Sequence, residues 1–199
     1  MRVISGSYRS RVLQAPRGTA TRPTSDRLRE TLFNVLATRV AGARFADLYA
    51  GSGAVGIEAI SRGAAEVFFA ETGAAAVAAI RGNLRALGIA SGWTLEAGGV
   101  APLLQRFTGA PLDLIFLDPP YESADEYRRT LGTLGGERGR LLLAADGLVI
   151  AEHTRKQGLE DRYGRLERTR TLLQGDAALS FYRWSATETD PSTESGPTA

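Results

Sequence analysis

A glycine-rich turn lies at Asp47-Leu48-Tyr49-Ala50-Gly51-Ser52-Gly53-Ala54-Val55-Gly56, after an apolar stretch and before a helix-forming one. Its glycines fit the pattern G-x-G-x-x-G. Glycines at a strand-to-helix turn permit a tight bend and let backbone N–H groups approach a ligand closely. This segment therefore predicts a strand, a ligand-contacting loop and a helix, in that order.

Apolar strands and helices alternate outward from this turn. Strands are predicted over 45–50, 66–71, 93–97, 112–117 and 147–151, and helices over 54–62, 74–87, 100–107 and about 123–145. Strands that are apolar on both faces and alternate with helices are typical of a parallel sheet covered by helices. Two later stretches, 166–173 and 178–184, flank a Gly-Asp turn and predict an antiparallel hairpin.

The N-terminal part of the chain is strongly basic. Residues 1–44 hold nine arginines against Asp26 and Glu30, a net charge of +7, so the remainder carries −5 of the overall +2. Such asymmetry favours a polyanionic partner that contacts one end of the molecule. A composition with a single lysine explains the choice of arginine but not its clustering. We expect a nucleic-acid surface that includes Arg2, Arg9, Arg11, Arg22 and Arg27.

The same part predicts local structure and a division of the chain. Residues 2–4 and 12–13 predict a small hairpin, and Thr24 or Ser25 can cap a following helix. We predict a basic N-terminal extension over 1–40 and a catalytic domain over 41–184. Residues 185–199 are rich in Ser, Thr, Glu, Pro and Gly, which predicts a disordered tail.

Composition excludes several kinds of chemistry. The chain has no cysteine and one histidine, so disulfides, cysteine nucleophiles and zinc sites are excluded, and we expect no metal. No apolar run approaches the roughly 20 residues of a membrane helix, and the first residues do not resemble a signal peptide. We expect a cytoplasmic monomer. His153 is predicted to be structural, and Trp93 and Trp184 to lie in the core.

An acidic residue ends the strand after the glycine turn. Glu71 lies 20 residues beyond Gly51, where a carboxylate can accept hydrogen bonds from ribose hydroxyls. Together, loop and acid fit both a nicotinamide dinucleotide and S-adenosylmethionine.

The second motif separates these ligands. Asp118-Pro119-Pro120-Tyr121 follows the apolar strand 112–117, and ligands of open α/β sheets bind outside the carboxyl ends of strands. The prolines stiffen the loop. The Asp118 carboxylate and the Pro119 carbonyl can accept hydrogen bonds from one planar amino group, while Tyr121 stacks on the attached ring. Acceptors placed in this way stabilise the positive charge that develops when the amine attacks a sulfonium methyl group.

These motifs resemble a known family. Asp118-Pro119-Pro120-Tyr121 matches the (Asp/Asn)-Pro-Pro-(Tyr/Phe) motif of amino methyltransferases. Residues 22–34 resemble a signature of the bacterial small-subunit rRNA guanine-N2 methyltransferases, the RsmD family. So do 2–6 with 9–11, 47–58 and 175–179, and the resemblance runs in order over 1–184.

The resemblance implies a Rossmann-like class I methyltransferase fold. Its seven-stranded, mostly parallel sheet would end in an antiparallel hairpin, preceded by the small N-terminal hairpin and helix. The implied reaction is methyl transfer from S-adenosylmethionine to the exocyclic N2 of a guanine in 16S rRNA, guanine 966 by the family's numbering. The implied partner is this rRNA within a partly or fully assembled small subunit.

The resemblance also implies site residues. The implied catalytic set is Asp118, Pro119, Pro120 and Tyr121. The implied cofactor pocket comprises Asp47, Tyr49, Gly51, Ser52, Gly53, Gly56, Glu71, Gly99, Val100 and Asp118. One departure is Gly99-Val100, where many relatives have Asp or Asn followed by Ala. Adenine must then be recognised by backbone groups or packing.

Three alternatives remain. A DNA adenine-N6 methyltransferase shares the Asp-Pro-Pro-Tyr motif, but this chain leaves little room for a target-recognition domain. An NAD-dependent oxidoreductase could use the same glycine loop, but a proton-donating Tyr-x-x-x-Lys helix is missing. A non-catalytic RNA-binding module would transfer no methyl group.

Overall fold

The structure is a computed structural model, and it describes residues 1–16, 25–120 and 124–185. In chain order its elements are α1 (Asp26–Leu36), η1 (Ala37–Arg39), β1 (Arg44–Leu48), α2 (Ala54–Ser61), β2 (Glu66–Ala70), α3 (Ala74–Ala86), β3 (Trp93–Glu96), α4 (Val100–Arg106), β4 (Leu112–Leu117), α5 (Ala124–Gly135), α6 (Glu137–Leu142), β5 (Leu143–Thr154), β6 (Arg162–Tyr163), β7 (Leu166–Gln174) and β8 (Ala177–Trp184). The predicted disordered tail lies outside the described residues beyond Ser185.

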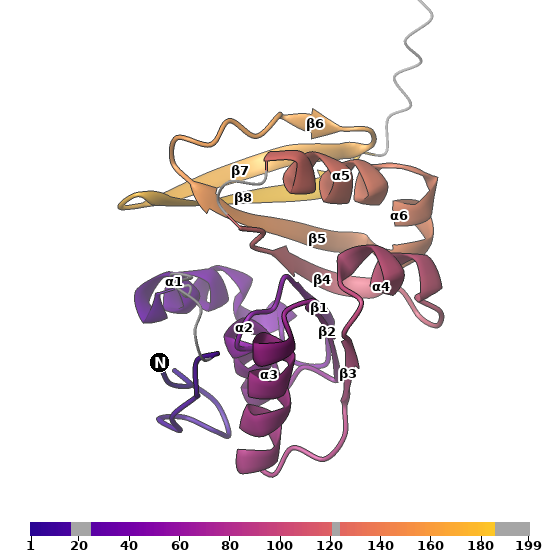
Figure 1. The fold of residues 1–199 in the computed structure, drawn as a ribbon. Coiled ribbons are helices and arrows are strands. Elements are labelled where there is room, and N and C mark those ends of the chain that lie inside the picture. Colours follow the sequence, from indigo (N-terminus) through magenta and orange to yellow (C-terminus); the bar gives the residue numbers. More distant parts are fainter. Residues whose placement is uncertain (17–24, 121–123, 186–199) are drawn as a thin grey trace, which may run out of the picture.

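One mixed sheet organises the described chain, with strand order β3-β2-β1-β4-β5-β8-β7-β6 (Figure 1). Strands β1 to β5 pair in parallel, and β8, β7 and β6 are added antiparallel. We predicted seven strands, and the described part contains eight. The additional strand, β6, has only two residues, too few to show an apolar alternation in the sequence.

The strand order reverses at β1, which lies between β2 and β4. The loops that follow β1 and β4 are therefore neighbours at the carboxyl edge of the sheet. Leu48 pairs with Leu117 in the register, and the Asp118 N–H donates to the Leu48 carbonyl at 3.4 Å. Ligands of open α/β sheets bind at such a switch point.

Helices cover both faces of the sheet (Figure 1). One buried cluster joins α1, α2 and α3 to sheet residues that include Phe45, Phe69 and Phe116. The other joins α4, α5 and α6 to the opposite face, at residues such as Leu48, Phe68 and Leu117. Because neighbouring strand residues point to opposite faces, the continuous apolar runs of β1, β2 and β4 supply both clusters.

The N-terminal segment forms the predicted hairpin only in part. Three backbone hydrogen bonds cross it, from the N–H groups of Val3, Ser10 and Leu13 to the carbonyls of Arg11, Val3 and Met1. Only one isolated antiparallel bridge forms, between Arg2 and Val12. The reason is that several backbone donors between these residues bond to α2 and its end instead of across a hairpin. The N–H groups of Ile4 and Ser5 donate to the Glu58 carboxylate, and that of Ser7 donates to the Ser61 carbonyl.

Helix α1 begins as the sequence predicts. The Ser25 hydroxyl accepts a hydrogen bond from the Leu28 N–H at 3.1 Å, so Ser25 is the N-cap. Thr24, the other candidate cap, lies outside the described residues. Val3 and Leu13 share the buried cluster of α1 and the sheet, so the N-terminal segment packs on the common core.

The predicted long helical region over 123–145 is wrong at its end. The helix stops at Gly135, where a side chain would overlap the Tyr163 carbonyl, and the short helix α6 follows. Strand β5 then begins at Leu143 and runs to Thr154, so His153 lies within the strand rather than after it. No helix in the described residues is long and apolar enough to span a membrane.

Candidate active site

The three glycines of the loop after β1 have different structural roles. Gly51 and Gly53 have φ values of +55° and +76°, a backbone region that favours glycine, and Gly53 is the N-cap of α2. A Cβ at Gly56 would overlap the ring of Phe69, so this glycine lets α2 approach β2 closely. A Cβ at Gly51 would meet nothing within 4 Å, so the loop has open space beside it.

Asp47, near the end of β1, is hydrogen-bonded to the helix that follows this loop. It is 2% exposed, and its Oδ2 accepts the Gly56 N–H at 2.8 Å. Burial raises the pKa of this carboxyl from its ordinary value to about 8, although the bond from Gly56 opposes the shift. Its side chain therefore shapes the loop by holding the first turn of α2.

Glu71 follows β2 and contacts the glycine loop directly. Its Oε2 accepts the Gly51 N–H at 2.7 Å, and its Oε1 accepts the N–H groups of Thr72 and Gly73, each at 2.8 Å. These bonds fix the carboxylate beside the loop. An ionised carboxylate has about four acceptor positions, so capacity remains for a ligand hydroxyl.

The side chains of Tyr49 and Ser52 point to other elements. The Tyr49 hydroxyl donates to Glu126 Oε2 at 2.8 Å and lies 2.7 Å from Thr130 Oγ1, both on α5. Burial raises the pKa of Tyr49. The Ser52 hydroxyl donates to the Met1 sulfur at 3.5 Å. The hydroxyl groups of both residues are therefore engaged within the protein.

Gly99 lies between β3 and α4, with φ at +90°. A Cβ at this position would lie 2.6 Å from Thr72 Cγ2, in the loop after β2. A side chain at Gly99 would therefore be strained by the positive φ and by its contact with Thr72. Val100 begins α4 and packs on the buried cluster of that face.

The second motif is at the end of β4. Asp118 is half-exposed, Pro119 is buried and Pro120 is exposed. The bond from the Asp118 N–H to the Leu48 carbonyl joins this loop to the strand that carries the glycine loop. Tyr121 lies outside the described residues.

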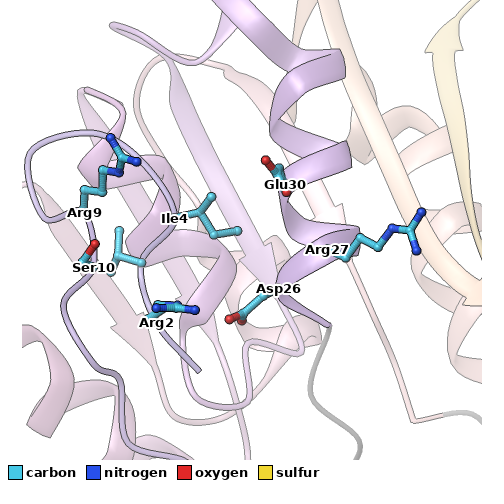
Figure 2. A pocket seen from close by; sticks show the side chains of 8 residues that line it. Arg2, Ile4, Arg9, Ser10, Asp26, Arg27 and Glu30 are labelled. Atoms are coloured by element: carbon cyan, nitrogen blue, oxygen red, sulfur yellow. The ribbon is translucent and has the colours of Figure 1, made fainter.

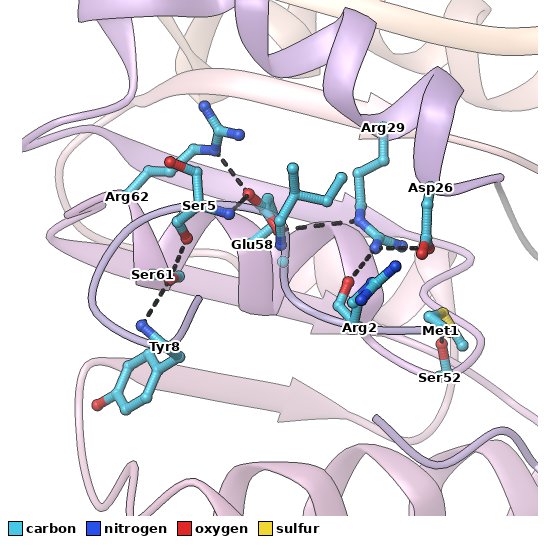
Figure 3. Close-up of polar contacts among 12 residues, drawn as sticks. Met1, Arg2, Ser5, Tyr8, Asp26, Arg29, Ser52, Glu58, Ser61 and Arg62 are labelled. Atoms are coloured by element: carbon cyan, nitrogen blue, oxygen red, sulfur yellow. Dashed lines mark hydrogen bonds and ion pairs between the residues drawn. The ribbon is translucent and has the colours of Figure 1, made fainter. Parts of the chain in front are cut away.

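Sequence reasoning missed a buried ion pair beneath the N-terminal segment (Figure 3). Arg29 and Glu58 are both fully buried, with Arg29 Nε 3.9 Å from Glu58 Oε2. Glu58 also accepts Arg62 Nε at 2.7 Å, and Arg29 donates to the Arg2 carbonyl and to Asp26. The available signal was a charged residue among the apolar positions of each helix.

Asn83 is a second residue that sequence reasoning missed. It is 2% exposed on α3, and its amide donates to the carbonyls of Gln14, at 3.1 Å, and Ser52, at 3.0 Å. Its Oδ1 accepts the Gln14 N–H at 2.8 Å. It therefore bonds both the N-terminal segment and the glycine loop.

The predicted nucleic-acid arginines lie on and beside the N-terminal segment. Arg2, Arg9, Arg11 and Arg27 are exposed, and none of them forms an ion pair within the described residues. Arg22 lies outside those residues. His153, by contrast, is 4% exposed, with Nε2 2.9 Å from Ser180 Oγ, and burial lowers its pKa.

The sheet order, with a glycine loop and an Asp-Pro-Pro loop at its switch point, is the architecture of class I methyltransferases. The chain belongs to the family whose model is described as "Conserved hypothetical protein 95", which matches residues 1–183. The expected resemblance to the RsmD family is confirmed.

Individual relatives match over nearly the whole chain. The Bacillus subtilis (strain 168) protein YlbH, provisionally assigned as an rRNA methyltransferase, is 37% identical over 92% of this chain and 98% of its own. Ribosomal RNA small subunit methyltransferase D of Escherichia coli (strain K12) is 33% identical over 94% of this chain and 91% of its own. A solved structure of Escherichia coli yhhF, provisionally assigned as a methyltransferase, is 33% identical, with a TM-score of 0.79 over 94% of this chain and 99% of that one.

Proposed function

We propose that this protein transfers a methyl group from S-adenosylmethionine to the exocyclic N2 of a guanine in 16S rRNA, guanine 966 by the family resemblance. The observation that carries the proposal is the adjacency of the Asp118 loop and the glycine loop, joined by the bond between Asp118 N–H and the Leu48 carbonyl. Relatives named for rRNA methylation support the choice of substrate.

The loop geometry fits S-adenosylmethionine. The space beside Gly51 leaves room for a ligand, and Glu71 is fixed next to it with acceptor capacity for ribose hydroxyls. Gly53, Gly56 and Asp47 would keep the loop in shape, and Gly99 and Val100 would offer backbone and packing contacts to the adenine. When bound, S-adenosylmethionine supplies an electrophilic methyl group on a sulfonium centre.

Asp118 is proposed to hold the amino group that is methylated. Its carboxylate would accept one hydrogen bond from this group and the Pro119 carbonyl a second, while Pro120 stiffens the loop and Tyr121 stacks on the base. No proton has to leave before attack, because the pKa of a neutral aromatic amine is far too high. The carboxylate instead orients the amine and stabilises the positive charge that develops on it.

The rRNA backbone is proposed to be bound by the exposed Arg2, Arg9, Arg11 and Arg27, and by Arg22, which lies outside the described residues. Such contacts release counterions, so binding should weaken steeply as salt is raised. A monomer acting on a partly or fully assembled small subunit is part of this proposal.

The test measures tritium transfer from labelled S-adenosylmethionine to small-subunit particles, naked 16S rRNA and adenine-containing duplex DNA. Label on N2 of guanine in rRNA is expected. Label on DNA adenine instead, or no transfer to any substrate, would overturn the proposal. Wild-type protein that binds NADH but not S-adenosylmethionine would favour an oxidoreductase.

A further inference from the structure

A cleft of about 330 Å³ lies between the N-terminal segment and the first turns of α1 (Figure 2). Arg2 and Arg9 line it from the segment, and Asp26 and Glu30 line it from the helix, with Ile4 between the two walls. Arg27 also borders the cleft, but its side chain extends away from the segment in Figure 2. The cleft is therefore basic on one wall and acidic on the other.

Both walls are fixed to the same buried ion pair (Figure 3). Arg29 donates to the Arg2 carbonyl on one side and to Asp26 Oδ1, at 3.0 Å, on the other. Its partner Glu58 accepts the Ile4 N–H at 2.7 Å. The two walls of the cleft are thus held in place by groups inside the protein.

Three of the charged side chains that line the cleft form no ion pair within the described residues. These are Arg2, Arg9 and Glu30, and all three are exposed. Asp26, in contrast, is engaged by Arg29. Two guanidinium groups therefore face one available carboxylate across an apolar side chain.

This arrangement matches the chemistry of one RNA nucleotide. A volume of about 330 Å³ is at the small end of ligand pockets, which suits a single nucleotide and not a duplex. Guanidinium groups bind phosphate with paired hydrogen bonds. A carboxylate only accepts, so it favours a base edge with two adjacent N–H donors. Guanine has this edge at N1 and N2, whereas uracil has one N–H between two carbonyls.

We propose that this cleft binds one nucleotide of the substrate RNA, other than the methylated one, and prefers guanine there. The Arg2 and Arg9 side chains contact its phosphate, Glu30 accepts from N1–H and the N2 amino group, and Ile4 contacts the base. The identity of the ligand as substrate RNA rests on the proposed function. Met1, which precedes Arg2 in the chain, contacts Ser52 of the glycine loop, so the N-terminal segment extends from the cleft to that loop.

Binding of labelled RNA hexamers tests the proposal without any need for catalysis. The probes are a uridine hexamer, the same hexamer with one central guanosine, and one with inosine, which lacks the N2 amino group. Fluorescence anisotropy at low salt, with protein up to about 1 mM, measures affinity for the wild type, Arg9→Ala, Glu30→Ala and Arg183→Ala. Arg183 is a matched control, because it is exposed on β8 and has no ion pair in the described chain.

The wild type is expected to bind the guanosine hexamer about tenfold more tightly than the uridine hexamer, with inosine between them. Glu30→Ala should abolish this preference but keep uridine binding. Arg9→Ala should weaken all three probes and reduce the salt slope by about 1, which Arg183→Ala should not do.

Two results would overturn the cleft assignment: equal effects of Arg9→Ala and Arg183→Ala, or a guanosine preference that survives Glu30→Ala. A wild type that binds no hexamer would also overturn it. If the hexamers bind as expected but small-subunit rRNA gains no methyl group, the proposed function fails and the cleft assignment stands.

Discussion

The buried pair of Glu58 and Arg29 allows a quantitative prediction. Glu58→Gln keeps the size of the side chain but removes the charge that faces Arg29, which is fully buried. The backbone N–H groups of Ile4 and Ser5 each donate to one oxygen of Glu58. In the Glu58→Gln side chain one of these oxygens becomes an NH2 group, so one of the two backbone donors loses its acceptor. Breaking a buried ion pair from one side costs about 3–5 kcal/mol.

The lower end of that range applies here. In the Glu58→Gln protein Arg29 still has Asp26 as a partner, at 3.0 Å, and this contact offsets part of the lost charge interaction. The offset is partial, because the Asp26 side chain is 45% exposed and a solvent-exposed partner stabilises a buried charge less. We therefore expect Glu58→Gln to lower the free energy of unfolding by about 3 kcal/mol. The N-terminal segment, which Glu58 holds through two backbone donors, should exchange its amide hydrogens faster.

Urea denaturation followed by circular dichroism measures the first effect, and hydrogen exchange at Ile4 and Ser5 measures the second. Glu66→Gln is a matched control, since Glu66 pairs with Arg44 at the start of β2 and its side chain is 38% exposed. Loss of this ion pair should lower the free energy of unfolding by about 1 kcal/mol or less. A Glu58→Gln protein as stable as the control, with unchanged exchange at Ile4, would refute the reasoning.

Three further predictions concern the loop after β1. Gly56→Ala places a methyl group in the ring of Phe69 and should destabilise the protein by about 1–3 kcal/mol, which thermal denaturation measures; an unchanged Tm would show that α2 can move away. The pKa of Asp47 is raised from 3.8 to about 8, so wild-type stability should fall as pH rises across this interval, and Asp47→Asn should lack that loss; parallel stability curves for the two proteins would contradict the assignment. Glu71→Ala should weaken binding of S-adenosylhomocysteine about tenfold to hundredfold in calorimetry, with Glu71→Gln intermediate, and unchanged affinity would exclude Glu71 from the ribose site.

The parallel part of the sheet was predictable because most of its strands contain short apolar runs in the sequence. The apolar runs that became β1, β2 and β4 alternate with helices, and a parallel sheet is the architecture that buries both of their faces. Placing Asp118 beside the glycine loop needed only the rule that ligand sites lie at the carboxyl ends of strands. The bond between Asp118 and Leu48 agrees with that placement.

The unpredicted features depend on contacts between distant parts of the chain. The hydroxyl of Tyr49 contacts Glu126 and Thr130, more than 70 residues away, and the local sequence of the loop does not show these contacts. Glu58 and Arg29 lie on different helices, and no local pattern shows that they meet. The N-terminal hairpin forms no regular strands because the N–H groups of Ile4 and Ser5 donate to Glu58 on α2 and not across the hairpin.

The most direct test of the proposed function is mass spectrometry of nucleosides from 16S rRNA. The rRNA would come from a strain that lacks this protein, complemented with the wild type, with Asp118→Ala or with Asp118→Asn. The account predicts that N2-methylguanosine at the target position is absent in the deletion strain and restored by the wild type. Asp118→Ala should slow transfer at least about a hundredfold, and Asp118→Asn less if its amide oxygen faces the amine. Full methylation without the protein, or Asp118→Ala protein that transfers methyl groups at the wild-type rate under single-turnover conditions, would contradict it.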